Sequence, residues 1–430
     1  MKRIFALLLA AVMVVCLVGC GKDDPPPSQT VPSTTGSADK IPTGKLPTEP
    51  GEGVLTKVSY NATGADILAA KDTVVAKIGD RELTLGQLQV YYWMHYREFL
   101  NEYSYYLSYF GLDYTKALDT QACVELEEGS WQHFFLQSAL NSWHNYQSLA
   151  ILAEKHNTPM EEDLQKEMEE LEESLKQAAK DKKYESPDEL LQNEIGPGVT
   201  FDNYKAYQNI FYTGYSYYAQ QMKALDYSME QIETYYNEHE KELAESHITK
   251  ESGDLVDVRH ILISIEGGTK DDSGKTTYSD EDWENCRAKA QKLLDEWKAG
   301  EATEKSFADM AVEHSTDTGS ASNGGLYEGL NEETNFVEEF KAWYLDKNRQ
   351  VGDTGLVKST YGYHIMFYSA KEAEWIRVCR NQLTNADIEK LMESAKDASP
   401  ITIYYENVLL GNMDLTTGKE ITGTTEKAES

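Results

Sequence analysis

Two histidines and one aspartate stand in sequence contexts that could support chemistry. His260 lies in the apolar run of residues 258–263, and His364 lies in the apolar run of residues 361–367. Both runs are rich in β-branched and aromatic residues, which predicts buried strands. Asp317 lies between them on a predicted loop. The sequence therefore predicts a polar site, made of two imidazoles and one carboxylate, inside an apolar cup.

Three motifs in this region together resemble the parvulin family of peptidyl-prolyl cis/trans isomerases. They are His-Ile-Leu from residue 260, Ser-Thr-Asp from residue 315 and Tyr-Gly-Tyr-His-Ile from residue 361. The resemblance covers about residues 255–371, roughly a quarter of the chain. It implies a small antiparallel sheet surrounded by helices, and it implies isomerase activity toward X–Pro peptide bonds.

The resemblance also assigns roles to the polar residues. It implies that His260, Asp317 and His364 are the catalytic residues and that Ser359 or Thr360 contributes a hydroxyl to substrate binding. We expect the two imidazoles to hydrogen-bond to each other, so that each ring fixes the tautomer of the other. Two histidines and an aspartate can also hold a metal ion as a facial triad. The family arrangement explains the same residues without a metal or another cofactor.

An apolar cup for the proline ring is implied beside this network. In parvulins a leucine, a methionine and a phenylalanine commonly line the cup. Leu326 matches the leucine, and Phe336 and Phe340, four residues apart, match the other two positions. Phe336 in place of methionine is expected to narrow the cup and to keep it apolar. The usual Gly-Asp-Leu-Gly run is altered here, which leaves a shift of one residue open at Leu326.

Such a site needs neither a nucleophile nor a metal. An X–Pro amide rotates over a barrier of about 18–20 kcal/mol, and its uncatalysed exchange takes tens to hundreds of seconds. Charge-separated resonance stabilises the planar ground state, and the twisted transition state loses part of it. A pocket that removes water from the amide and binds the twisted form more tightly therefore accelerates the exchange. Asp317 near the substrate carbonyl would shape the electric field at the amide.

Phosphate dependence is not expected. Some parvulins prefer phosphorylated Ser or Thr before proline, and they carry basic residues after the first strand. In this chain the segment 266–282 contains six acidic residues against two lysines. These acidic residues would repel a phosphate group.

The residues before this region predict a helical domain. Residues 74–78 and 82–84 flank a Gly-Asp-Arg turn and predict a hairpin. Thr84 is placed to cap a long helix. Residues 85–245 are nearly all helical in pattern, with an amphipathic arm over residues 164–178. This hairpin followed by a helix resembles the opening of SurA- and PrsA-type foldases.

The residues after this region predict a helix at 385–396 and a strand at 401–405. By the same resemblance, residues 401–408 would add a strand to the N-terminal hairpin. The predicted fold class is α+β: a mostly helical chaperone domain, built from N- and C-terminal segments, with an inserted parvulin domain. The predicted parts are a signal peptide (1–19), a lipidated cysteine with a disordered tether (20–56), the helical domain (57–254), the parvulin domain (255–371), a C-terminal segment that packs on the helical domain (372–415) and a flexible tail (416–430).

The N-terminus predicts export and lipidation. Lys2 and Arg3 precede an apolar stretch that is too short to span a bilayer and that ends in Leu-Val-Gly-Cys at Cys20. This ending resembles a bacterial lipobox, so Cys20 is the predicted lipidation site; an ordinary secretory signal is the alternative. The Pro-, Ser- and Thr-rich stretch that follows cannot bury a core. These features predict a protein held by acyl chains on the extracytoplasmic face of the bacterial cell membrane.

Net charge and cysteine usage exclude two classes of protein. The formal net charge is −33, which argues against nucleic-acid binding because phosphate contacts need a basic surface. Cys123, Cys286 and Cys379 show neither the spacing of a disulfide framework nor that of a zinc ribbon. We therefore expect them to be buried or half-buried thiols.

Together these features predict a membrane-anchored foldase whose partners are unfolded exported polypeptides and the lipid bilayer. One alternative is a non-catalytic holdase chaperone with a degenerate parvulin domain. Another is a lipid-anchored solute-binding protein, but that class needs two α/β lobes, and residues 85–245 carry almost no strand pattern. The oligomeric state stays open, with a homodimer as one option.

Overall fold

The computed structural model describes residues 57–421, apart from gaps at 104–106, 108–109, 124–125, 127–128, 271–273, 275 and 415–418. The predicted signal peptide, Cys20 and the tether up to residue 56 lie outside the described residues. Helices and small antiparallel sheets occur together, which confirms the predicted α+β class. The described chain forms two compact units, one with residues up to 226 and from 385 onward, the other with residues 227–384.

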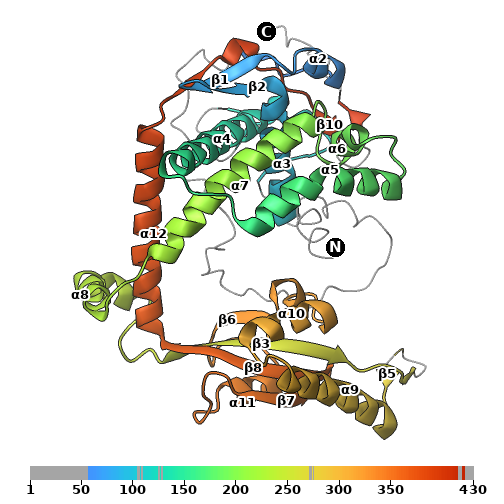
Figure 1. The fold of residues 1–430 in the computed structure, drawn as a ribbon, viewed down its shortest axis with the longest axis vertical. Helices are drawn as coiled ribbons and strands as arrows, with labels where there is room; N and C mark the ends of the chain where they lie inside the picture. The colour runs from blue at the N-terminus through green and yellow to red at the C-terminus, as the bar shows by residue number, and fades with distance from the viewer. Residues whose placement is uncertain are drawn as a thin grey trace. The chain divides into compact units, whose positions relative to one another are not determined.

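The first unit is mostly helical. Its α-helices are α2 (Gly64–Ala69), α3 (Leu85–Glu102), α4 (Trp131–His156), α5 (Glu162–Lys182), α6 (Pro187–Glu194) and α7 (Phe201–Ala224). As predicted, Thr84 caps α3, because its hydroxyl accepts a hydrogen bond from the backbone N–H of Gln87. Helices α3, α4 and α7 pack together (Figure 1) and bury Trp93, Phe135 and Trp143 completely. Burial of each such side chain contributes about 2–3 kcal/mol.

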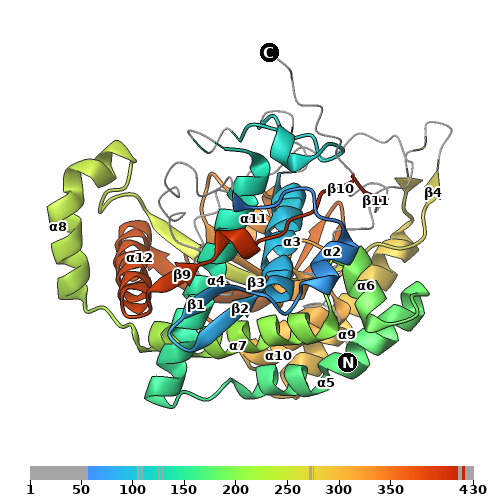
Figure 2. The same cartoon turned by 90° about the horizontal axis from the view of Figure 1, so that it is seen from above.

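The C-terminal residues complete this unit. The predicted hairpin is β1 (Val74–Ile78) with β2 (Arg81–Thr84). β9 (Ile401–Ile403) pairs antiparallel with β1, and Figure 2 shows the two strands side by side although they come from opposite ends of the described chain. This is the strand that the resemblance implied. Val408 and Leu410, which follow β9, are fully buried in the core of the unit.

A short strand falls within the predicted flexible tail. β10 (Met413–Asp414) pairs with β11 (Lys419–Glu420), and the backbone N–H of Ile421 donates to the carbonyl of Asn412 at 2.9 Å. Residues 419–421 of the predicted tail therefore have a paired backbone. Residues 422–430 lie outside the described residues.

The second unit is built on a four-stranded antiparallel sheet in the order β6-β3-β8-β7. These strands are β3 (Asp254–Ser264), β6 (Leu326–Leu330), β7 (Thr354–Ser359) and β8 (Gly362–Ala373), and a small hairpin joins β4 (Thr269–Lys270) to β5 (Thr276–Thr277). Helices α9 (Asp280–Ala299) and α10 (Glu304–His314) pack on Ile261 and Ile365 of one face. Helix α11 (Glu338–Tyr344) packs on Val258 and Met366 of the other face.

The boundary of the second unit differs from the predicted domain boundary at 254/255. Helix α8 (Met229–Glu245) packs through Tyr236 on Trp375 and Cys379, which lie in the first turns of α12 (Glu374–Asp397). This contact groups α8 with the second unit. Cys123, Cys286 and Cys379 are buried, as predicted. Within the described ranges, the helices are all too short or too polar to cross a membrane.

Candidate functional site

The two histidines of the candidate site lie on adjacent strands. In the register of β3 and β8, His260 faces Met366 and Leu262 faces His364, which makes the histidines diagonal neighbours on one face of the sheet. Their Nδ1 atoms are 3.1 Å apart. Only 3% of His260 and 5% of His364 is exposed. The predicted hydrogen bond between the two imidazoles is confirmed.

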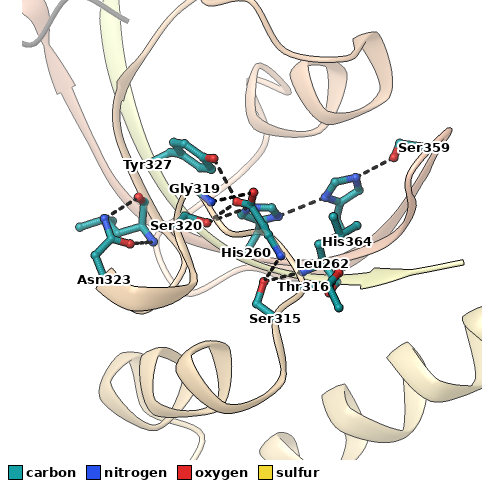
Figure 3. A network of polar contacts seen from close by, with 12 residues as sticks. His260, Leu262, Ser315, Thr316, Gly319, Ser320, Asn323, Tyr327, Ser359 and His364 are labelled. Carbon is teal, nitrogen blue, oxygen red and sulfur yellow. Dashed lines mark hydrogen bonds and ion pairs between the residues drawn. The ribbon is translucent and has the colours of Figure 1, made fainter. Parts of the chain in front are cut away.

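Asp317 reaches His260 because its loop is fastened to β3. The backbone N–H of Leu262 donates to Oγ of Ser315 at 3.1 Å, and the backbone N–H of Thr316 donates to the carbonyl of Leu262 at 2.9 Å. These bonds hold the next residue over the sheet, with Oδ2 of Asp317 2.8 Å from Nε2 of His260. Figure 3 shows this loop beside the histidine pair.

Two further donors meet at the same carboxylate oxygen. The hydroxyl of Ser320 donates to Oδ2 of Asp317, and the hydroxyl of Tyr327 donates to it at 3.0 Å. In Figure 3 both residues lie on the side of His260 that faces away from His364. Burial raises the pKa of Asp317, but the hydrogen bonds from His260 and Ser320 outweigh it and hold the pKa of this carboxyl well below its usual value. Asp317 is therefore a carboxylate.

When both histidines are neutral, each group in the network donates to the next in one direction, from Ser359 through His364 and His260 to Asp317. A carboxylate only accepts, so Nε2 of His260 carries the proton and its Nδ1 accepts from Nδ1–H of His364. Nε2 of His364 then accepts from the hydroxyl of Ser359, which lies 2.7 Å away. Burial and the neighbouring His260 lower the pKa of His364 to about 3, so this ring is neutral at pH 7.

This network leaves little room for a metal. His260 uses one ring nitrogen for Asp317 and the other for His364, while His364 uses its second nitrogen for Ser359. A metal ion would have to break a buried hydrogen bond for each nitrogen ligand it gained. The geometry therefore favours the hydrogen-bonded arrangement over the facial triad.

Aromatic rings form the apolar wall of the site. Phe340 lies edge-on to both imidazoles, with ring centroids 5.2 Å from His260 and 5.4 Å from His364. Phe336 stacks on Phe340 at 4.8 Å. Phe340 is buried and Phe336 is half-buried. The structure thus brings both predicted cup residues next to the predicted polar residues.

The structure places Tyr327, not Leu326, beside these rings. Tyr327 lies 4.9 Å from Phe336 and 5.4 Å from His260, measured between ring centroids. In β6 the residue before it, Leu326, pairs with Arg259, whose side chain bonds Glu304 of α10. Because successive strand residues point to opposite faces, Leu326 lies on the α10 face. The altered glycine motif was the one sequence signal of this one-residue shift.

The two predicted hydroxyl residues, Ser359 and Thr360, lie in different surroundings. Ser359 is bonded to His364, whereas Thr360 is exposed in the turn between β7 and β8. Ser320 was missed in the sequence, although its spacing of three residues from Asp317 suits a hydroxyl–carboxylate contact in a tight turn. Cys20, the predicted lipidation site, lies outside the described residues.

Comparison with known proteins finds a matching domain in the chain. Residues 242–372 match the family model of the PPIC-type PPIASE domain. Foldase protein PrsA 1 of Listeria monocytogenes serovar 1/2a is 30% identical over 149 residues, which are 32% of this chain and 49% of that protein. Foldase protein PrsA 1 of Listeria innocua serovar 6a is 43% identical over 81 residues, which are 18% of this chain and 25% of that protein. The chain thus spans between a quarter and a half of the length of these relatives.

Among solved structures, the crystal structure of PrsA from Bacillus subtilis is similar, with 18% sequence identity and a TM-score of 0.29. The match covers 65% of this chain and 93% of that chain. Residues 242–372 are therefore a PPIC-type PPIase domain of the parvulin family, carried in a chain that resembles PrsA foldases.

Proposed function

We propose that this protein is an extracytoplasmic, membrane-anchored foldase that binds unfolded exported polypeptides and catalyses cis/trans isomerisation of their X–Pro bonds. One observation carries the isomerase part. A buried hydrogen-bonded chain from Ser359 through both histidines to Asp317 lies directly against the stacked rings of Phe336 and Phe340. This is the combination of a polar network and an apolar wall that prolyl isomerisation needs.

The site would act by binding the twisted amide. The proline ring packs against Phe336 and Phe340, which removes water from one side of the peptide bond. Loss of amide resonance in the twisted state is easier in an apolar environment, because the charge-separated planar form loses its solvation there. The carboxylate of Asp317 sits next to this wall and repels a substrate carbonyl oxygen, which carries most of its negative charge in the planar form.

The hydroxyl of Ser359 supports the network and does not act as a nucleophile in this proposal. Ser359 is only 4% exposed. Its proton goes to Nε2 of His364, whose low pKa makes it a weak base. Ser359 therefore holds the orientation of His364, and His364 in turn holds that of His260.

Prolyl exchange in a short unphosphorylated X–Pro peptide, measured by NMR, tests the isomerase. We expect the wild-type chain to accelerate exchange and Asp317→Ala to lower kcat/KM by about tenfold to a hundredfold, since a charge-assisted hydrogen bond is lost at the site. Glu313→Gln, an exposed carboxylate in α10, is the matched control and should behave as wild type. If the wild type does not accelerate exchange in several peptides, the catalytic claim is wrong for them, and the holdase alternative takes its place as the leading hypothesis.

The membrane anchor and the clients are separate parts of the proposal. The lipobox-like ending at Cys20 supports an anchor, and the name of the PrsA relatives supports a foldase role. Cys20→Ser should move the protein from the membrane fraction to the soluble fraction and abolish incorporation of a labelled fatty acid. Unchanged membrane association of Cys20→Ser would contradict the anchor and leave the isomerase proposal intact.

A further inference from the structure

Tyr327 joins the aromatic and the polar halves of the site. Its ring lies edge-on to Phe336, with centroids 4.9 Å apart, and tilts over the imidazole of His260 at 5.4 Å. Its hydroxyl donates to Oδ2 of Asp317 at 3.0 Å. One side chain therefore contacts the apolar wall, a proposed catalytic imidazole and the carboxylate at the same time.

The backbone holds Tyr327 firmly over β3. The backbone N–H of His260 donates to the carbonyl of Gly325 at 2.8 Å. Gly325 has φ +73°, and a Cβ atom at this position would come within 2.1 Å of the carbonyl oxygen of His260. Only glycine permits this close approach. Tyr327 then pairs with Val258, so its side chain rises from the sheet on the face that carries His260.

The phenol is a permanent donor. Burial and the charge of Asp317 raise the pKa of Tyr327 to about 12. Oδ2 of Asp317 accepts three hydrogen bonds, from the hydroxyl of Tyr327, the hydroxyl of Ser320 and the N–H of His260. The other oxygen, Oδ1, accepts the backbone N–H of Gly319 at 3.3 Å, a long bond that leaves this oxygen able to face a substrate amide.

We propose that Tyr327 is a positioning and specificity-determining residue: its hydroxyl fixes the carboxylate of Asp317, and its ring completes a three-ring wall that admits a five-membered prolyl ring and disfavours a larger one. This inference rests on the proposed isomerase function. A phenol ring fills more of the cup than an aliphatic side chain does, and three converging rings leave less space than two.

Two substitutions in the full-length chain separate the two roles. Tyr327→Phe removes only the hydroxyl, while Tyr327→Leu removes the hydroxyl and the ring. Exchange is measured by NMR in matched peptides that contain proline or pipecolic acid, its six-membered analogue. Tyr361→Phe and Tyr361→Leu are the controls, because this tyrosine is 61% exposed on the β7–β8 turn. Backbone amide spectra of each variant verify that the domain is folded.

We expect Tyr327→Phe to lower kcat by about tenfold, with KM within about twofold of wild type, since the ring wall is kept and a hydrogen bond to a charged group is lost. We expect Tyr327→Leu to lower kcat similarly and to reduce the preference for proline over pipecolic acid by about fivefold. Wild-type kcat in Tyr327→Phe would overturn the positioning role. An unchanged preference in Tyr327→Leu would overturn the specificity role.

A second readout does not depend on activity. When Tyr327→Phe removes one of three donors from Oδ2 of Asp317, the remaining bond from His260 strengthens, and the ¹H resonance of its Nε2–H should move downfield. If the wild type fails to accelerate exchange, the proposed function is overturned, while this shift still decides the positioning role: a downfield move supports it, and an unchanged resonance overturns it.

Discussion

The Nδ1 atoms of His260 and His364 lie 3.1 Å apart in a buried setting. At this distance one nitrogen must carry a proton and the other must not, because two N–H groups would repel and two lone pairs would leave no bond. The pair is thus one hydrogen-bonded unit with a direction, because one ring donates the hydrogen bond and the other accepts it. Asp317, at one end of the unit, and Ser359, at the other, decide which direction it takes.

The first prediction concerns this direction. At pH 7 we expect His260 to be protonated at Nε2 and His364 at Nδ1, because the carboxylate of Asp317 demands a donor. Long-range ¹H–¹⁵N correlation spectra of the imidazoles measure the tautomers directly. The signals can be assigned with His260→Gln and His364→Gln. A proton found on Nε2 of His364 would show that the network runs the other way, from His260 toward Ser359.

The second prediction is a loss of stability of the second unit in acid. The pKa of His364 is about 3 in the folded protein, well below the value of about 6.5 expected when it is unfolded. The unfolded chain therefore binds a proton that the folded chain does not between these two pH values, and stability falls as pH falls through that window. One such group costs about 2 kcal/mol between pH 7 and pH 5.

Hydrogen exchange at the amides of β3 and β8 reports on this unit without interference from the histidines of the first unit. We expect the opening free energy of these strands to fall on acidification in the wild type. In His364→Leu the pH dependence should be weaker by about 2 kcal/mol over the same range, whatever the absolute stability of that variant. Equal pH slopes in the two proteins would show that His364 titrates normally.

The third prediction is that phosphorylation before proline slows the reaction. The site holds the carboxylate of Asp317, whose pKa lies well below its usual value, and residues 266–282 carry six acidic residues against two lysines. Arg259, the residue before His260 in β3, is already bonded to Glu304 and to two backbone carbonyls. We expect kcat/KM to rank Lys-Pro and Ala-Pro above Glu-Pro, and Glu-Pro above phosphoSer-Pro. Faster exchange of the phosphorylated peptide would contradict this ranking.

Local sequence patterns were enough to predict the two strands that carry His260 and His364. The β-branched runs around His260 and His364 fix both strands, and the alternation of strand residues then brings both rings to one face. The same local logic placed the Thr84 cap and the hairpin of β1 and β2, because capping and turn residues act within a few positions.

Features that depend on distant contacts were harder to predict. A shift of one residue in β6 decides whether Leu326 or Tyr327 points toward the site. Only the pairing of β6 with β3 determines which of the two does. The grouping of α8 with the second unit depends on its contact with Trp375, more than a hundred residues further along the chain.

The fourth prediction tests whether the C-terminal segment is a structural part of the first unit. Asn412 is 3% exposed. Its Oδ1 accepts the backbone N–H of Leu118 at 2.8 Å, and its Nδ2 donates to the carbonyl of Tyr60 at 3.2 Å and to Asp119 at 3.0 Å. One amide thus ties the C-terminal segment to two distant parts of the unit.

Asn412→Ala leaves a buried N–H and a buried carbonyl without their partner, which should cost about 2–4 kcal/mol of unfolding free energy. Asn412→Asp should cost at least as much, because it replaces a donor with a charge beside Asp119. Asn381→Ala, an exposed position on α12, is the control and should stay within about 0.5 kcal/mol of wild type. Urea unfolding, monitored through hydrogen exchange of the amides in α3 and α4, measures these differences in unfolding free energy. A loss in Asn412→Ala no larger than that of the control would mean that this amide does not fasten the C-terminal segment to the first unit.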